Sequence, residues 1–233
     1  MLFSIPGWAG LERPAPCLRN SSRNPVWPDE KGVIVVKSCW SVLIVGIICL
    51  GLSTTTWGLS EAFKENIYNP GQLKPVDSNL KVKVGEPAPD FTLPSVSGGA
   101  VNLRQYRGKK NVVISFVPAA WTPVCSDQWP GYNIVKALFD ENEAILLGIT
   151  VDNIPTLFAW TKQMGVLWFP VLSDFWPHGA VADRYGLLRS DGVSERALIV
   201  IDKLGIIRAI HVSDINIRPD LEWCAIELEE LNP

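Results

Sequence analysis

The sequence predicts an α/β fold in which a central mixed sheet is covered by helices on both faces and is preceded by an apolar N-terminal helix. Two observations predict it. Short runs that are almost entirely apolar, as is typical of strands buried on both faces, alternate with longer stretches of helical character. About 150 residues in the C-terminal part of the chain carry this alternation, which is ample for one hydrophobic core.

The individual elements follow from these runs and from the residues that break them. Three runs have the composition of central strands, and a fourth follows the turn Lys203-Leu-Gly205 as a hairpin partner. The expected strands are residues 111–117, 144–151, 197–201 and 206–212. Helices are expected between them, with prolines breaking the longest loop. The expected helices are residues 124–141, 154–164, 178–185 and 219–231.

An apolar stretch near the N-terminus indicates targeting to a membrane. No charged residue occurs from Ser38 to Ser60. About 20 apolar residues are needed to span a bilayer. The polar run Ser53–Thr56 shortens this stretch, so residues 33–60 fit either a signal peptide or a membrane anchor. We therefore expect an exported (periplasmic or extracytoplasmic) protein, or one held at the membrane through residues 38–60 if the segment is not cleaved.

The segments on either side of this stretch lack periodicity. Residues 1–32 are rich in Pro, Arg, Asn and Trp, and they are interpreted as an unstructured or spurious extension. Residues 61–81 are expected to form a polar linker. Residues 82–233 are expected to form the folded domain.

Composition argues against several classes of function. The net charge of −3 and the pI near 5.5 argue against nucleic acid as a partner, and the chain has neither a basic amphipathic stripe nor a glycine-rich phosphate-binding motif. His178 and His211 are the only histidines, and no two cysteines are closely spaced. A zinc site would therefore need mainly carboxylates, and neither a metal nor a cofactor is expected.

One cysteine has the surroundings of a reactive thiol. Cys125 follows the apolar run of residues 111–117 after a short turn. Thr122 is a good N-cap and Pro123 suits the first helical position, which places Cys125 three residues after the cap. Unpaired backbone N–H groups in the first turn of a helix stabilise a thiolate. The alternative is that Cys125 is a small apolar residue that fills the core.

Four separated segments resemble the peroxiredoxins. The spacing Pro118-x-x-x-Thr122-x-x-Cys125 resembles the active-site loop of that family. Residues 83–93 are similar to its opening segment, and residues 196–202 are similar to the strand that carries its active-site arginine. Residues 169–181 resemble the branch with one essential cysteine, the alkyl hydroperoxide reductase E-like enzymes. The resemblance extends from about residue 82 to residue 231 and implies a thioredoxin-like sandwich.

The resemblance also implies a role for each site residue. Cys125 would be the peroxidatic nucleophile that reduces hydrogen peroxide or organic hydroperoxides and becomes a sulfenic acid. Arg196 would stabilise the thiolate and donate hydrogen bonds to the peroxide. Thr122 would bridge thiolate and peroxide, and Pro118 would close the pocket against water. Without the resemblance, a surface ion pair with Glu195 or with a nearby aspartate is the alternative for Arg196.

The chain departs from the family pattern beyond the nucleophile. Many members carry Glu three residues after it, where this chain has Gln128, so the arginine would be oriented by a neutral hydrogen-bonding group. Trp129-Pro130-Gly131 follows directly. Proline removes a backbone donor and clashes with the preceding turn, so we expect a bend or an interruption in this helix.

The sulfenic acid must be reduced by a second thiol. Cys224 shares a helical stripe with Leu221, Leu228 and Leu231, so burial and a resolving role are the two alternatives for it. Otherwise the reductant is external, either a thioredoxin-like protein or a small thiol, and a homodimer is one expected assembly. Two other functions compete with the peroxidase: a thiol-disulfide oxidoreductase of the same fold, disfavoured because no Cys-x-x-Cys occurs, and a non-catalytic thioredoxin-like sensing or binding module.

Overall fold

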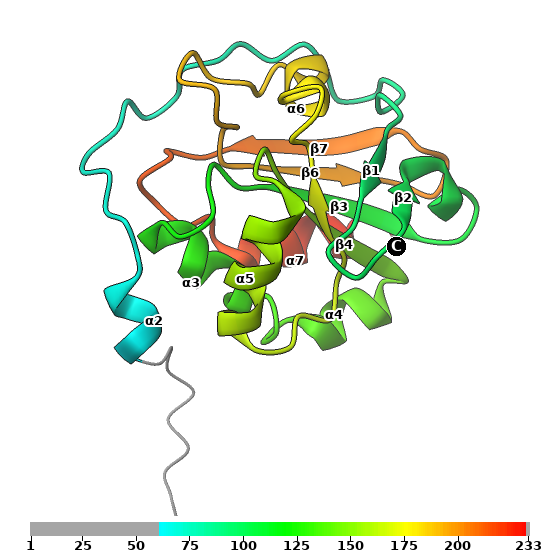
Figure 1. Cartoon of the computed structure of the whole chain (residues 1–233). Helices are drawn as coiled ribbons and strands as arrows, with labels where there is room; N and C mark the ends of the chain where they lie inside the picture. The colour runs from blue at the N-terminus through cyan, green and yellow to red at the C-terminus, as the bar shows by residue number, and fades with distance from the viewer. Residues whose placement is uncertain (1–60, 232–233) are drawn as a thin grey trace, which may run out of the picture. The chain divides into compact units, whose positions relative to one another are not determined.

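The computed structural model describes residues 61–231, and its centre is a mixed five-stranded sheet (Figure 1). The strand order is β5-β4-β3-β6-β7. Strands β3, β4 and β5 are parallel, whereas β6 is antiparallel to β3 and β7 is antiparallel to β6. The strands are β3 (Asn111–Phe116), β4 (Ala144–Thr150), β5 (Val171–Ser173), β6 (Ala197–Ile201) and β7 (Ile207–Val212). The expected mixed sheet is confirmed.

Both faces of the sheet are covered, as the alternation of side chains along β3 shows. Val113 packs into one apolar cluster, with Trp160 and Leu228, and Ile114 packs into the other, with Tyr185. Figure 1 shows α6 and the helices α3, α5 and α7 on opposite sides of the sheet. The helices of these layers are α3 (Pro123–Gly131), α4 (Lys136–Glu141), α5 (Ile154–Met164), α6 (Ala180–Tyr185) and α7 (Leu221–Glu229).

The helix expected over residues 124–141 is two helices, α3 and α4, separated by turns. Pro130 lies in the last turn of α3, and the helix ends one residue later. The interruption expected at Trp129-Pro130-Gly131 is therefore present. Beyond it, the carbonyl of Tyr132 accepts a hydrogen bond of 3.1 Å from Trp168 Nε1, a partner from outside the helix.

The short elements are absent from the sequence-based prediction. They are β5, the hairpin of β1 (Thr92–Pro94) and β2 (Ala100–Asn102), the 3-10 helix Leu103–Tyr106 and α2 (Glu61–Glu65). Elements of three to five residues are too short to show a hydrophobic period. The other helices and strands lie within one or two residues of their expected bounds, which is the ordinary uncertainty of an element end.

Residues 61–81, expected as a polar linker, lie against the domain, and we call them the N-terminal arm. The arm begins with α2, in which Phe63 is 1% exposed, and then runs in extended form over the domain (Figure 1). At its far end the N–H of Lys81 donates to the carbonyl of Tyr185 in α6 (3.1 Å). The arm is held by contacts with residues distant in the sequence, which a local sequence pattern does not reveal.

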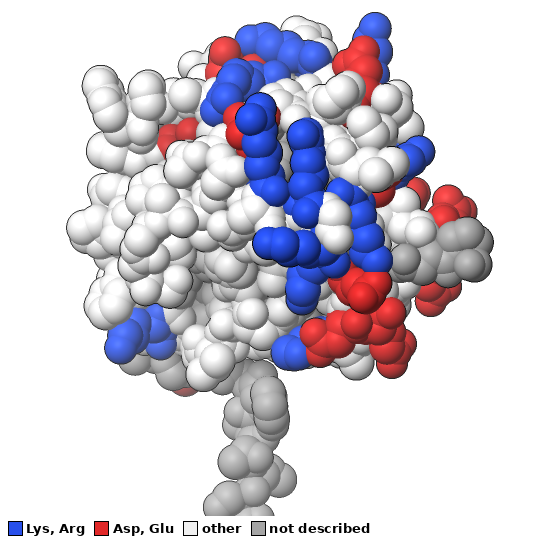
Figure 2. All heavy atoms as spheres, turned by 90° about the vertical axis from the view of Figure 1, so that its right-hand side faces the viewer, with Lys and Arg blue, Asp and Glu red and all other residues white. Residues whose placement is uncertain are grey.

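The surface of the described part is of mixed charge. Figure 2 shows Lys and Arg side chains gathered on the face that lies to the right in Figure 1, with Asp and Glu side chains beside them. Several pairs of opposite charge form on the surface, such as Arg218 with Asp127 at 2.7 Å. Within residues 61–231, no helix is long and apolar enough to cross a membrane. The predictions for residues 1–32 and 33–60 concern residues outside those described.

Candidate active site

Cys125 lies in the first turn of α3, directly after the central strand β3 and its following loop. Thr122 has the extended backbone of an N-cap residue (φ −107°, ψ 155°), and its carbonyl accepts the N–H of Ser126 at 3.0 Å, which closes the first helical turn. The side chain of Cys125 is fully buried. The nucleophile candidate therefore occupies the helix start that the sequence predicts, where backbone N–H groups favour a thiolate.

Thr122 occupies the cap position without capping through its side chain. Its hydroxyl donates instead to the carbonyl of Ala119, three residues back in the loop (2.9 Å). Pro118 is buried in the same loop. The loop is held by the segment that follows β4, because Asp152 accepts the N–H of Ala120 at 2.8 Å. The loop that carries Pro118 and Thr122 is thus held by a residue that lies outside the loop.

Arg196 meets Cys125 from the neighbouring strand. It directly precedes β6, which pairs with β3, and its guanidinium is buried, at 2% exposure. Arg196 Nη2 donates to Cys125 Sγ at 3.3 Å, and Nε and Nη2 both donate to the carbonyl of Ile215, at 3.1 and 3.0 Å. The ion pair with Glu195 considered from the sequence is not formed. Glu195 instead pairs with Arg189 at 2.8 Å.

Gln128 orients the guanidinium as a neutral group. Its Oε1 accepts from Arg196 Nη1, and its Nε2 donates to Tyr132 Oη at 3.1 Å and to Ser115 Oγ at 3.2 Å. All of these side chains are buried, and burial raises the pKa of Tyr132 to about 12, so its phenol stays protonated. Among the groups of residues 61–231 that are hydrogen-bonded to Arg196, none is a carboxylate, and the sulfur of Cys125 is the one that can carry negative charge.

Three members of this network are missed by the sequence analysis: Ser115, Tyr132 and the carbonyl of Ile215. Ser115 lies within an apolar strand and Tyr132 one turn after Gln128, and neither position has a pattern that predicts a polar contact. The contribution of Ile215 comes from its backbone, so its residue type carries no signal.

Cys224 lies in α7 and is buried in the same apolar cluster as Cys125. Both thiols are free. Burial raises the pKa of Cys224 to about 12, and the charge of Glu227 adds to the shift. Because the thiolate is the nucleophile, this thiol is a weak one near neutral pH in the folded protein. Cys224 is thus buried, as one of the two alternatives from the sequence has it. The other alternative, a resolving role, stays a prediction.

We expect iodoacetamide to label Cys125 well before Cys224 in the folded protein near neutral pH. The raised pKa of Cys224 keeps it as a thiol, whereas Cys125 lies in the first turn of α3 and accepts a hydrogen bond from Arg196. Peptide mass spectrometry over a time course of alkylation measures both rates. Unfolded protein is the control, since both cysteines should then react alike. Equal labelling in the folded state would contradict the contrast drawn between the two sites.

The two histidines have other contacts. His178 Nε2 lies 2.6 Å from the carbonyl of Gly192, and the ring of His211 lies 5.1 Å from that of Trp223. Within residues 61–231, no group of three or more His, Cys, Asp or Glu side chains is arranged to hold a metal ion.

A family model described as the AhpC/TSA family matches residues 84–210, which is more than half of the chain. The chain belongs to the AhpC/TSA family. The matched range includes Pro118, Thr122, Cys125, Gln128 and Arg196, whereas the N-terminal arm and Ile215 lie outside it. The resemblance to peroxiredoxins is thereby confirmed.

Individual relatives agree with this family. Alkyl hydroperoxide reductase E of Mycobacterium tuberculosis is 41% identical over 128 residues, which cover 54% of this chain and 83% of that protein. Peroxiredoxin-2 of Cricetulus griseus is 36% identical over 142 residues, 57% of this chain and 70% of that protein. The reduced 2-Cys peroxiredoxin of Plasmodium vivax superimposes with a TM-score of 0.60 at 31% identity, covering 64% of this chain and 81% of that chain. The expected thioredoxin-like fold is confirmed for this AhpC/TSA domain.

Proposed function

We propose that this AhpC/TSA protein is a thiol-dependent peroxidase in which Cys125 is the peroxidatic cysteine. The observation that carries the proposal is the hydrogen bond of 3.3 Å from Arg196 Nη2 to Cys125 Sγ, in the first turn of a helix and away from water. The thiolate is the attacking form in peroxide reduction, and a guanidinium that donates to the sulfur can stabilise its negative charge. The relatives named above are peroxide-reducing enzymes by name.

The reaction follows from these groups. The Cys125 thiolate attacks the nearer oxygen of the hydroperoxide, an S–O bond forms and the O–O bond breaks. The departing oxygen takes both electrons of that bond and, with a proton, leaves as water or an alcohol, while Cys125 becomes a sulfenic acid. Arg196 has N–H groups next to the sulfur that can follow the charge onto the departing oxygen. Thr122 supplies a hydroxyl at the same helix start. Pro118 is proposed to close the pocket against water without offering a competing N–H.

The reductant that closes the cycle is proposed to be external, a thioredoxin-like protein or a small thiol. The burial and the raised pKa of Cys224 support this proposal over resolution within the chain. A homodimer is a further proposal. Export or attachment to the membrane through residues 38–60 is proposed from the apolar sequence, and fractionation of cells with N-terminal sequencing of the native protein tests it.

Mixing the reduced full-length protein with hydrogen peroxide in a stopped-flow instrument tests the peroxidase. Trp121 and Trp129 lie within four residues of the thiol, so tryptophan fluorescence is expected to report its oxidation. We expect oxidation far faster than that of a free thiol, and dimedone should trap a sulfenic acid at Cys125. Oxidation at the rate of a free thiol would refute the peroxidase and favour a non-catalytic module. Disulfide exchange in place of peroxide reduction would favour the oxidoreductase, which the absence of Cys-x-x-Cys disfavours.

A further inference from the structure

The N-terminal arm contacts both chain segments that carry the catalytic groups, although it lies outside the part of the chain that matches the family model. The first contact is at the loop before α3. Phe63 of the arm packs edge-on against Trp121, with ring centroids 5.6 Å apart, and the N–H of Tyr68 donates to the carbonyl of Trp121 at 2.8 Å. Trp121 directly precedes the cap residue Thr122.

Trp121 needs such support because of its backbone. Its φ of 60° is in the left-handed region, which non-glycine residues rarely adopt and which persists only where surrounding structure enforces it. The arm supplies a hydrogen bond and a ring contact to this residue. The strained turn sets the direction in which the chain enters α3, and therefore where Cys125 lies.

The second contact is at the carbonyl on which Arg196 rests. Ile215 accepts two hydrogen bonds from the Arg196 guanidinium, and the N–H of Ile215 donates to the carbonyl of Pro75 in the arm at 3.0 Å. The next residue, Asn216, pairs with the backbone of Leu73: the Leu73 N–H donates to Oδ1, and Nδ2 donates to the Leu73 carbonyl, both at 2.9 Å. The arm therefore holds in place the backbone at residues 215 and 216, whose Ile215 carbonyl accepts the hydrogen bonds of the catalytic arginine.

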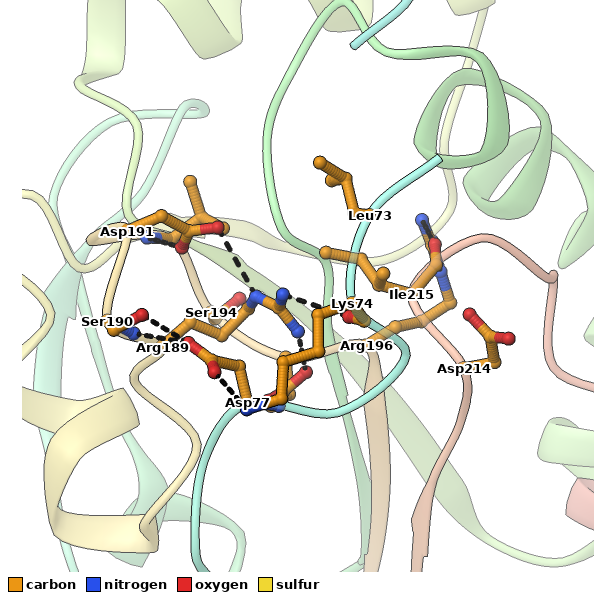
Figure 3. A network of polar contacts seen from close by, with 12 residues as sticks. Leu73, Lys74, Asp77, Arg189, Ser190, Asp191, Ser194, Arg196, Asp214 and Ile215 are labelled. Atoms are coloured by element: carbon orange, nitrogen blue, oxygen red, sulfur yellow. Dashed lines mark hydrogen bonds and ion pairs between the residues drawn. The ribbon is translucent and has the colours of Figure 1, made fainter. Parts of the chain in front are cut away.

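The third contact fastens the arm on the other side of Arg196 (Figure 3). Arg189 and Glu195 form a buried ion pair, and each also holds the arm. Arg189 Nη2 donates to the carbonyl of Lys74 at 3.0 Å, and Glu195 Oε1 accepts the N–H of Asp77 at 2.6 Å. Glu195 directly precedes Arg196 in the sequence. The arm is therefore bonded to residues that precede the arginine in the chain and to residues that follow it.

We propose that residues 63–77 of the arm are a positioning element of the peroxidase site, acting on Cys125 through Trp121 and on Arg196 through Ile215. This inference rests on the proposed function. Peroxide reduction depends on sulfur and guanidinium being aligned with the same oxygen, and a misplacement of about 1 Å can cost roughly 100-fold in rate. A segment that positions the sulfur and the guanidinium through intermediate residues can therefore affect the rate of peroxide reduction without contacting the peroxide.

Two variants of the full-length protein break the contact at residue 216 from its two sides. Asn216→Ala removes both hydrogen bonds to the arm, together with the side-chain bond from Asn216 Nδ2 to Asp214. Leu73→Pro removes the Leu73 N–H donor, whereas the carbonyl at position 73 and the bond from Asn216 Nδ2 to Asp214 remain. Asn133→Ala is the matched control, because it also deletes a half-buried amide bonded to a distant backbone carbonyl, that of Val166, which is not bonded to Arg196.

The rate constant of Cys125 oxidation by hydrogen peroxide is measured across a range of pH, alongside thermal unfolding. We expect both Asn216→Ala and Leu73→Pro to react roughly 10- to 100-fold more slowly than the wild type, and Asn133→Ala to react at the wild-type rate. We also expect the rise of the rate with pH to move to higher pH, because Arg196 is the charged group bonded to the sulfur. The double variant should lose little more than either single one, since both act on one contact.

The inference would be overturned if Asn216→Ala and Leu73→Pro lowered the unfolding temperature but kept the rate and the pH profile of the wild type. The arm would then have a structural role only. An effect of Asn216→Ala that Leu73→Pro does not reproduce would overturn it too, since the contact would then act through Asp214. A wild-type protein that reacts no faster than a free thiol would instead overturn the proposed function, and this inference with it.

Discussion

Replacing Arg196 with alanine is expected to slow the oxidation of Cys125 by hydrogen peroxide by about 10²- to 10³-fold, the usual cost of losing one preorganised donor to a developing negative charge. Arg196 donates to the sulfur at 3.3 Å and is held in place by Gln128 and the carbonyl of Ile215. Its removal leaves the thiolate and the departing oxygen without that donor. Stopped-flow tryptophan fluorescence measures the rate.

Arg196→Lys and Cys125→Ser are the controls for this result. Lysine keeps the charge but lacks the planar fork that reaches sulfur, amide and carbonyl at once, so a loss between wild type and alanine is expected. Cys125→Ser sets the baseline with no thiol at the site. An Arg196→Ala rate within about twofold of the wild type, a free-energy difference well under 1 kcal/mol, would show that the arginine does not act on the reaction.

Replacing Glu195 with alanine is expected to lower the free energy of unfolding by about 3 kcal/mol, because it removes the buried carboxylate and leaves the guanidinium of Arg189 with only the half-exposed Asp191 at 3.5 Å. The side chains of this pair are 2% and 0% exposed, with an N–O distance of 2.8 Å. Glu195 also accepts the N–H of Asp77, so the arm loses one of its attachments in the same variant. Urea unfolding, followed by circular dichroism, measures the change.

Asp140→Ala is the matched control for the buried pair. Lys136 and Asp140 pair on one face of α4, with side chains 50% and 57% exposed, and an exposed pair of this kind is worth less than about 1 kcal/mol. Equal losses for Glu195→Ala and Asp140→Ala would show that burial of the Arg189 pair has no energetic consequence. The double variant Arg189→Met with Glu195→Leu should recover part of the loss, because no buried charge is then left unpaired.

The sequence by itself determined the order and type of the long elements, the place of Cys125 at a helix start and the family. These features are local. An apolar run of six or seven residues identifies a central strand, and Thr122 followed by Pro123 identifies a helix start, whatever surrounds them. The interruption near Pro130 is local in the same sense, since proline disrupts a helix within one turn.

Only the tertiary structure decided which groups complete the site. Arg196 and Cys125 are 71 positions apart, and the acceptor that holds the arginine is a backbone carbonyl, which no residue type announces. The arm has the polar composition of a linker, yet its N–H and C=O groups find buried partners in Arg189 and Glu195 and a half-buried one in Asn216. Such contacts depend on where the chain returns in space, and a pattern along the sequence does not contain that information.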